Sequence, residues 1–247
     1  MLFRSALPAP RLEVNKGSTI IATNDGWDKG GNGTQIANAA TSVGAFPLGA
    51  GDGDTAVLLT LDPGTYTATI RGFNGAVGDV LAEVYDVSKN GTRLTNLSTL
   101  ASISEAGGFI NPGIVIEGNN PRTLVARAVA PGLATFGLPT EALLGDPSIT
   151  VLNGTGATVA TNNNWNQAAA CGVSQAGTLA AVFPAVGAFT LTPGNDAALV
   201  SALAPGSFTL RAAAQAAPAG GTGAATGGTT PTVNQTGMVL VEIYEVP

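Results

Sequence analysis

Short runs of alternating apolar and polar residues recur along the chain. In residues 65–70, threonine alternates with tyrosine, alanine and isoleucine, the period of two expected of a β-strand with one buried face. Pro63-Gly64 and Asn153-Gly154 are typical of the tight turns between such strands. The helical period is weak almost everywhere. Short strands separated by turns predict an all-β fold of antiparallel sandwich type, either jelly-roll or immunoglobulin-like.

Three blocks of sequence occur twice in the same order. They are GSTIIATNDGW and GTGATVATNNNW, DTAVLLTLDPGTYT and DAALVSALAPGSFT, and VLAEVYDV and VLVEIYEV. We therefore predict two tandem β-sandwich modules, copy one at residues 1–93 and copy two at residues 94–247. Copy two has an additional Ala/Gly/Thr-rich loop at residues 212–237. Two interpretations of this loop are open, a contact loop at the edge of the module and a tolerated insertion.

The segment between the repeated blocks contains strand-like runs at residues 94–103, 109–117 and 123–129. The third run recurs, because LVARAVAPGL in copy two aligns with MLFRSALPAP at the start of the chain. Copy one is therefore expected to begin in mid-module and to lack a counterpart of residues 94–121. A sandwich without these strands exposes apolar inner faces and unpaired sheet edges.

Three explanations for the missing strands are open. The chain is cut from a longer array, or residues 94–121 complete copy one instead of copy two, or a strand from a neighbouring subunit fills the gap by strand addition. A head-to-tail contact of the third kind propagates into fibres when its rotation closes no ring. The candidate assembly residues are the apolar side chains of these strands, namely Leu97, Ile103, Phe109, Ile110, Ile114 and Ile116.

Composition argues against most enzyme chemistry. The sequence contains no histidine and one cysteine, Cys171, so histidine-dependent catalysis, cysteine-ligated metal clusters and an internal disulfide are excluded. We expect a non-enzymatic protein, although chemistry by carboxylates alone stays open. The net charge of −6 argues against nucleic-acid binding. No apolar run of about 18 residues, the length of a membrane-spanning helix, occurs. The first residues do not resemble an ordinary signal peptide.

Several residues have a chemical and a structural interpretation. The four acidic residues of two Gly-rich loops, Asp25, Asp28, Asp52 and Asp54, could bind Ca²⁺, but turn formation is the favoured interpretation, and we expect no cofactor.

Trp27 and Trp165 recur at equivalent positions, where they either stack on a sugar ring or, as we favour, close the end of a sandwich. Glu83 and Glu242 also recur, and we expect each to be a partly covered carboxylate paired with an arginine or a backbone N–H. Cys171 is expected to be a small buried apolar residue.

The order of motifs resembles a repeat found in large secreted bacterial proteins. Its pattern runs LxNLSTRG, GFxI, VLIRAxGPSL, NDNW, LPPGAYTAxVRG and LVEVYDL. Copy two matches it with LTNLSTLASIS, GFINPGIVIEG, TLVARAVAPGL, NNNW, LAPGSFTLRA and MVLVEIYEV. It departs from the pattern in LSTLA and at Asn163. The resemblance implies an extracellular or cell-surface β-sandwich, similar to the C-terminal pre-peptidase domains of secreted hydrolases.

Together these features predict a secreted structural protein whose partner is a further copy of itself, assembling into a filament or surface layer. Low charge, with 11% of residues charged against a usual value of about 25%, suits a subunit that consists largely of contact surface. The alternative is a module that binds carbohydrate or another cell-surface polymer and is accessory to secreted enzymes. A hydrolase that uses carboxylates alone is the third hypothesis.

Overall fold

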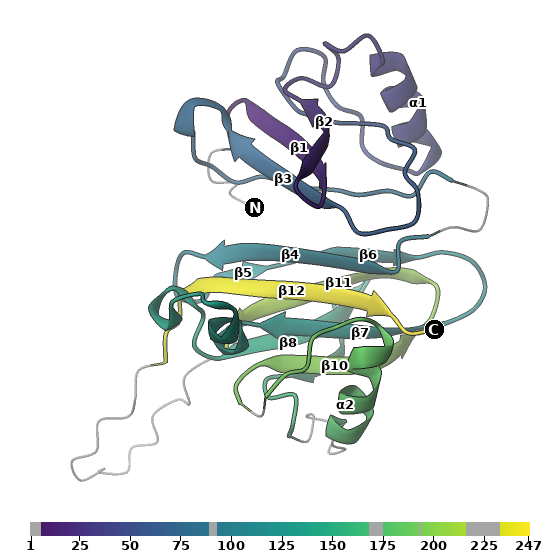
Figure 1. Ribbon diagram of the computed structural model, residues 1–247. Helices are drawn as coiled ribbons and strands as arrows, with labels where there is room; N and C mark the ends of the chain where they lie inside the picture. Colours follow the sequence, from purple (N-terminus) through teal and green to yellow (C-terminus); the bar gives the residue numbers. More distant parts are fainter. Residues whose placement is uncertain (1–5, 89–92, 168–174, 193, 216–232) are drawn as a thin grey trace. The chain divides into compact units, whose positions relative to one another are not determined.

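The computed structural model describes residues 6–88, 93–167, 175–192, 194–215 and 233–247. Over these residues the chain is an all-β protein, in which antiparallel strands form three sheets and helices are few (Figure 1). The predicted fold class is therefore confirmed. The chain divides into two compact units, Met1–Arg93 and Leu94–Pro247, which have the bounds of copy one and copy two. Most of the 212–237 loop lies outside the described residues, as does Cys171.

Copy two consists of two sheets with one hydrophobic core. The first sheet has the order β10 (Ala197–Leu203), β7 (Arg122–Val129), β12 (Gly237–Glu245) and β4 (Asn96–Ile103). In the second sheet β11 (Gly206–Ala214) pairs with β5 (Phe109–Ile110), β6 (Gly113–Ile116) and β8 (Pro147–Asn153), and β8 pairs with β9 (Thr158–Asn162). The strand-like runs predicted between residues 94 and 129 are confirmed by β4 to β7.

The burial of each strand in copy two follows from its place in the sheets. β8 alternates, so that Ile149 and Val151 lie in the core while Ser148, Thr150 and Leu152 are partly exposed. β7 is buried from Leu124 to Val129, because β10 and β12 cover its two edges and the core and flanking segments cover its faces. Asn153-Gly154 forms the predicted turn between β8 and β9, and the Asn153 side chain accepts hydrogen bonds from the N–H groups of Thr155 and Ala157.

Within its described residues, copy one has a single sheet, in which β1 (Pro10–Lys16) lies between β2 (Thr19–Asn24) and β3 (Thr67–Gly72). Residues 54–61 and 80–87, for which the repeat predicts strands, are not strands. We expected a sandwich of two sheets in copy one, but residues 6–88 form one sheet. The physical reason is the lack of neighbours, since a strand is stable only when its backbone groups are paired.

Two helices were not predicted from the sequence. They are α1 (Gly33–Ser42) in copy one and α2 (Ala176–Ala185) in copy two, and short 3₁₀ turns occur at Phe73–Gly75, Pro131–Phe136 and Thr140–Ala142. The helices are rich in Ala, Gly and Thr, so that only Ile36 of α1 and only Leu179 and Phe183 of α2 are buried. An apolar stripe this narrow gives little helical periodicity. No helix within the described ranges is long and apolar enough to cross a membrane.

Candidate functional site

The same hydrogen bonds hold the Trp-containing loop in both copies. In copy one, Trp27 donates from its backbone N–H to Asp54 O (2.9 Å) and from Nε1 to Gly49 O (3.0 Å). In copy two, Trp165 makes these bonds to Asp196 O (2.9 Å) and Thr192 O (3.0 Å).

The segments next to these loops also correspond. Ala56 N donates to Asn24 Oδ1 in copy one, and Ala198 N donates to Asn162 Oδ1 in copy two, both at 3.2 Å. The register shifts at one point in the pairing of β1 with β2, and again at the corresponding point in the pairing of β8 with β9. The sheet β2-β1-β3 therefore repeats β9-β8-β11, and the sequence match extends to atomic contacts.

The copies differ in the residues that form the other sheet of copy two. There, Val239 is fully buried and Tyr244 is 7% exposed in β12. The matching residues of copy one, Val80 and Tyr85, are 50% and 43% exposed. We call residues 80–87 the open strip; its exposed apolar side chains are Val80, Leu81, Val84, Tyr85 and Val87.

Residues 54–61, which match β10, add further exposed apolar side chains. They are Leu58, Leu59 and Leu61. Leu61 corresponds to Leu203, which is buried in copy two, whereas Leu58 and Leu59 correspond to the partly exposed Val200 and Ser201. Contiguous exposed apolar residues of this kind mark interaction surfaces.

A buried charged cluster joins β7 and β12 in copy two. Arg127 is fully buried, its Nε lies 2.8 Å from Glu242 Oε2, and a second guanidinium nitrogen contacts the same oxygen. The guanidinium also donates to Phe189 O and stacks over the Phe189 ring at 4.2 Å. Glu242 is thus paired with an arginine, as expected, and the two buried charges compensate each other.

Tyr244 completes this cluster. Its hydroxyl donates to Glu242 Oε1 at 2.7 Å. Burial and the adjacent Glu242 carboxylate raise the pKa of Tyr244. The cluster therefore holds a neutral tyrosine and an ion pair in fixed positions, which is a structural arrangement.

Copy one repeats the Tyr–Glu part of this cluster at the surface. Tyr85 Oη donates to Glu83 Oε1 at 3.2 Å, and both residues are exposed. The pKa of Tyr85 is raised by partial burial and by Glu83. Arg4 matches Arg127 in sequence and lies outside the described residues. The open strip thus carries the polar pair that copy two encloses within its sandwich.

In copy two, β4 lies against the cluster. Ser98 Oγ is 3.5 Å from Glu242 Oε1, and Asn96 Nδ2 donates to Ile243 O at 3.0 Å. β4 pairs with β12, and β5 and β6 pair with β11. The hypothesis that residues 94–121 complete copy one in place of copy two is therefore wrong, because these strands carry the backbone pairing of copy two.

The candidate assembly residues have different environments. Ile103 and Ile116 belong to the core of copy two, where they are not available to a partner. Ile110 and Ile114 are half-buried against the same core. Leu97 and Phe109 are exposed. Of the six residues, the last two lie at the surface.

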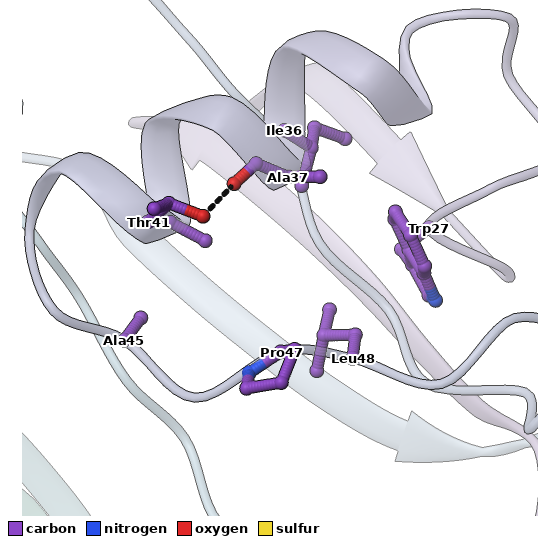
Figure 2. Close-up of a pocket in the computed structure, with 8 residues that line it drawn as sticks. Trp27, Ile36, Ala37, Thr41, Ala45, Pro47 and Leu48 are labelled. Carbon is purple, nitrogen blue, oxygen red and sulfur yellow. Dashed lines mark hydrogen bonds between the residues drawn. The ribbon is translucent and has the colours of Figure 1, made fainter.

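The two tryptophans also differ in exposure. Trp165 is 7% exposed and packs against Phe183, with ring centroids 5.7 Å apart, so it is too covered to stack on a sugar ring. Stacking on a sugar ring, the less favoured interpretation, is therefore excluded for Trp165, because Phe183 of α2 packs against the indole. Trp27 is half-buried and lines a pocket under α1 (Figure 2).

The acidic loops of copy one are organised by turn hydrogen bonds. Asp28 Oδ2 accepts from Gly51 N (2.9 Å), and Asp52 Oδ1 accepts from Asp54 N (3.2 Å). Burial and the neighbouring Asp52 carboxylate raise the pKa of Asp54. No cluster of acidic, histidine or cysteine side chains suited to a metal ion occurs in the described part of the chain. At Asp25, the backbone carbonyl oxygen accepts a hydrogen bond from Lys29 Nζ.

Asp196 is a buried carboxylate of copy two that sequence comparison did not single out. It is 2% exposed and accepts hydrogen bonds from Ala130 N (2.9 Å) and Gly132 N (3.1 Å). Burial raises its pKa, although these bonds and Arg127 act in the opposite direction. In the sequence, Asp196 is marked only by its match with Asp54 at the start of a repeated block.

A scan against models of protein families and a search of curated proteins found no match to this chain.

Proposed function

We propose that this protein is an extracellular structural subunit that binds further copies of itself through the open strip of copy one. The observation that carries the proposal is the contrast between residues 80–87 and β12. Nearly the same sequence is enclosed in one copy and exposed in the other. Each large apolar side chain that becomes fully buried stabilises a contact by about 1.5–3 kcal/mol. The open strip thus offers a substantial driving force for association.

Copy two indicates which structure covers such a strip. There, β12 pairs with β7 on one side and with β4 on the other, antiparallel in both cases. β4 is the last strand of its sheet, so its outer edge has no strand partner among the described residues. Leu97 and Leu100 of β4 are exposed. An unprotected edge of this kind readily accepts a further strand.

The partner of the open strip is therefore the outer edge of β4 in another copy. The two surfaces lie on different modules of one chain, so the contact is head-to-tail. Such a contact propagates into a filament unless its rotation closes a ring. The low charge of the chain, at 11% of residues, reduces the repulsion between neighbours in such an assembly. An extracellular or cell-surface location follows from the resemblance to repeats of secreted proteins.

A lysine placed in the open strip tests the proposal. Leu81 is 73% exposed, so Leu81→Lys leaves the fold of copy one intact while it places a charge on the edge that must pair. Val77→Lys is the matched control, because Val77 is 86% exposed and lies outside the strip. In light scattering and electron microscopy, we expect the wild type and Val77→Lys to form polymers with rising concentration. Leu81→Lys should stay monomeric at concentrations at least tenfold higher.

Two outcomes contradict the proposal. Monodisperse wild-type particles at every concentration would exclude a filament. Protection of the residue 80–87 amides from hydrogen exchange in a wild-type monomer would mean that the strip finds its partner within its own chain.

The alternative function is binding of a cell-surface polysaccharide. Of the two tryptophans, only the half-buried Trp27 is exposed enough to contact a sugar ring. Retention on polysaccharide gels that is lost on Trp27→Ala and kept on Trp165→Phe would favour it.

A further inference from the structure

A pocket of about 310 Å³ lies under α1 in copy one. Figure 2 shows α1 on one side, with Ile36 and Ala37, and Pro47 and Leu48 on the facing segment, while Trp27 stands at one end. The complete lining consists of Trp27, Ile36, Ala37, Ala40, Thr41, Ala45, Pro47 and Leu48. The volume is at the lower end of the range of about 300–1,000 Å³ that small-molecule sites occupy.

Copy two contains the same substructure, and backbone hydrogen bonds fix the correspondence. Ile36 N donates to Asn32 O as Leu179 N donates to Gln175 O. After the helix, Ala45 N donates to Ala40 O at 3.0 Å, and Ala188 N donates to Phe183 O at 2.8 Å.

The turn that ends each helix is also the same. Gly44 and Gly187 have positive φ angles of 71° and 74°, which glycine adopts without strain. With both ends of the helix matched, Ala40 corresponds to Phe183, and Ile36 to Leu179.

The pocket exists because alanine stands where copy two has phenylalanine. Phe183 is fully buried, and its ring lies 5.7 Å from that of Trp165 and 4.9 Å from the Arg127 guanidinium. Ala40 has no ring to place against Trp27. The space that a phenyl group fills in copy two is thus open in copy one, with the tryptophan kept as its wall.

The chemistry of the lining selects the occupant. Thr41 is the only lining residue with a side-chain hydroxyl, and it already donates to Ala37 O at 2.9 Å. Trp27 Nε1 is likewise engaged, by Gly49 O. A sugar ring would find few polar partners here, and its hydroxyl groups would lose hydrogen bonds to water. A planar aromatic ring needs none and packs favourably against an indole.

We infer that this pocket binds a small planar aromatic ligand of about the size of a phenyl group. The ligand takes the place beside Trp27 that Phe183 has beside Trp165. Apolar cavities left by a missing side chain are known to accept benzene-sized ligands in other proteins. This site is independent of the open strip and does not depend on the proposed assembly.

The two tryptophans allow a direct test with a built-in control. In the full chain labelled with 5-fluorotryptophan, Trp27 and Trp165 give separate ¹⁹F resonances. Titration with phenol should shift the Trp27 resonance saturably, in the millimolar range, and leave the Trp165 resonance in place. Nuclear Overhauser effects from phenol to the methyl groups of Ile36 and Leu48 should accompany the shift.

Filling the pocket should abolish binding. Ala40→Phe recreates the arrangement of copy two, and we expect it to weaken phenol binding at least tenfold. Ala39→Phe is the matched control, because Ala39 lies next to Ala40 on α1 and does not line the pocket. It should bind phenol as the wild type does.

Three results would overturn the inference. The first is a Trp27 resonance that does not respond in the wild type, and the second is an equal response of Trp165. The third is a Trp27 resonance that moves with protein concentration alone and ceases to do so in Leu81→Lys, because the pocket would then be filled by another copy. The first two results are measured on the wild type, so the conclusion does not depend on whether Ala40→Phe folds.

Discussion

At the scale of single residues, the buried ion pair of copy two offers the largest expected effect. The side chains of Arg127 and Glu242 are 0% and 5% exposed, so removal of one partner leaves an uncompensated charge within the protein. We expect Glu242→Gln to lower the free energy of unfolding of copy two by about 3–5 kcal/mol in urea denaturation. The matched change Glu83→Gln in copy one alters an exposed carboxylate and should stay within about 0.5 kcal/mol.

Equal effects of the two substitutions in the monomeric protein would contradict this prediction. A larger effect of Glu83→Gln in the assembled protein is expected, because assembly encloses the strip that carries Glu83.

Asp196 predicts a pH dependence with a definite sign. Burial raises its pKa in the folded state above the ordinary value of 3.8. At pH values between the unfolded and the folded pKa, Asp196 is therefore protonated more often in the folded protein than in the unfolded chain. The contribution of Asp196 to stability falls as the pH rises through this range. Asp196→Asn removes this titration while keeping an oxygen acceptor for Ala130 N.

The measurement is urea denaturation of both proteins between pH 3.5 and 7. We expect the stability of Asp196→Asn relative to the wild type to increase as the pH rises, and then to level off. A difference that is constant with pH would show that the hydrogen bonds and Arg127 balance the effect of burial on the pKa, and a change in the other direction would show that they outweigh it.

At the scale of secondary-structure elements, the proposed contact joins an edge strand to an unpaired segment. Leu100 of β4 is 53% exposed, so Leu100→Glu places a charge on the strand whose outer edge accepts the open strip, without disturbing the core. We expect Leu100→Glu alone to reduce assembly as Leu81→Lys does. A chain that carries both substitutions should regain assembly, because the opposite charges meet across the interface.

Sedimentation velocity measures the assembled fraction in each case. Val115→Glu is the control, since Val115 is a similarly exposed residue of the neighbouring sheet on β6. Failure of the double variant to recover, with both single variants folded, would exclude β4 as the partner of the open strip.

At the scale of the whole molecule, the two copies are expected to differ greatly in stability. The buried hydrophobic residues in the described part of copy one are Val14 and Ile36, whereas copy two buries residues from both sheets and from α2. Stability grows with the apolar area removed from water. In the monomeric Leu81→Lys variant, unfolding should therefore proceed in two steps, and copy one should unfold at the lower urea concentration.

The ¹⁹F resonances of Trp27 and Trp165 report the two steps separately. We expect the first transition to move to higher urea in assembled wild-type protein, because the open strip is then covered. Coincident transitions in the monomeric variant would contradict the difference in core size.

Much of copy two could be predicted from the sequence. The runs that became β4, β6 and β7 were recognisable because alternation and flanking turn residues act over a few positions. The helices were missed, since their apolar stripes are too narrow for periodicity to reveal. The pocket was also missed, although VGAF at residues 43–46 and again at residues 186–189 aligns Ala40 with Phe183, because a sequence match does not show that Phe183 packs against Trp165.

The sequence by itself determined that the chain is built from a repeat of β-forming segments. It could not determine which of these segments become strands. VLVEIYEV forms β12, with neighbours on both sides, whereas VLAEVYDV has the same pattern and forms no strand. The physical reason is that local pattern sets the preference of a segment, while backbone pairing and burial, which depend on distant residues, decide whether that preference is realised.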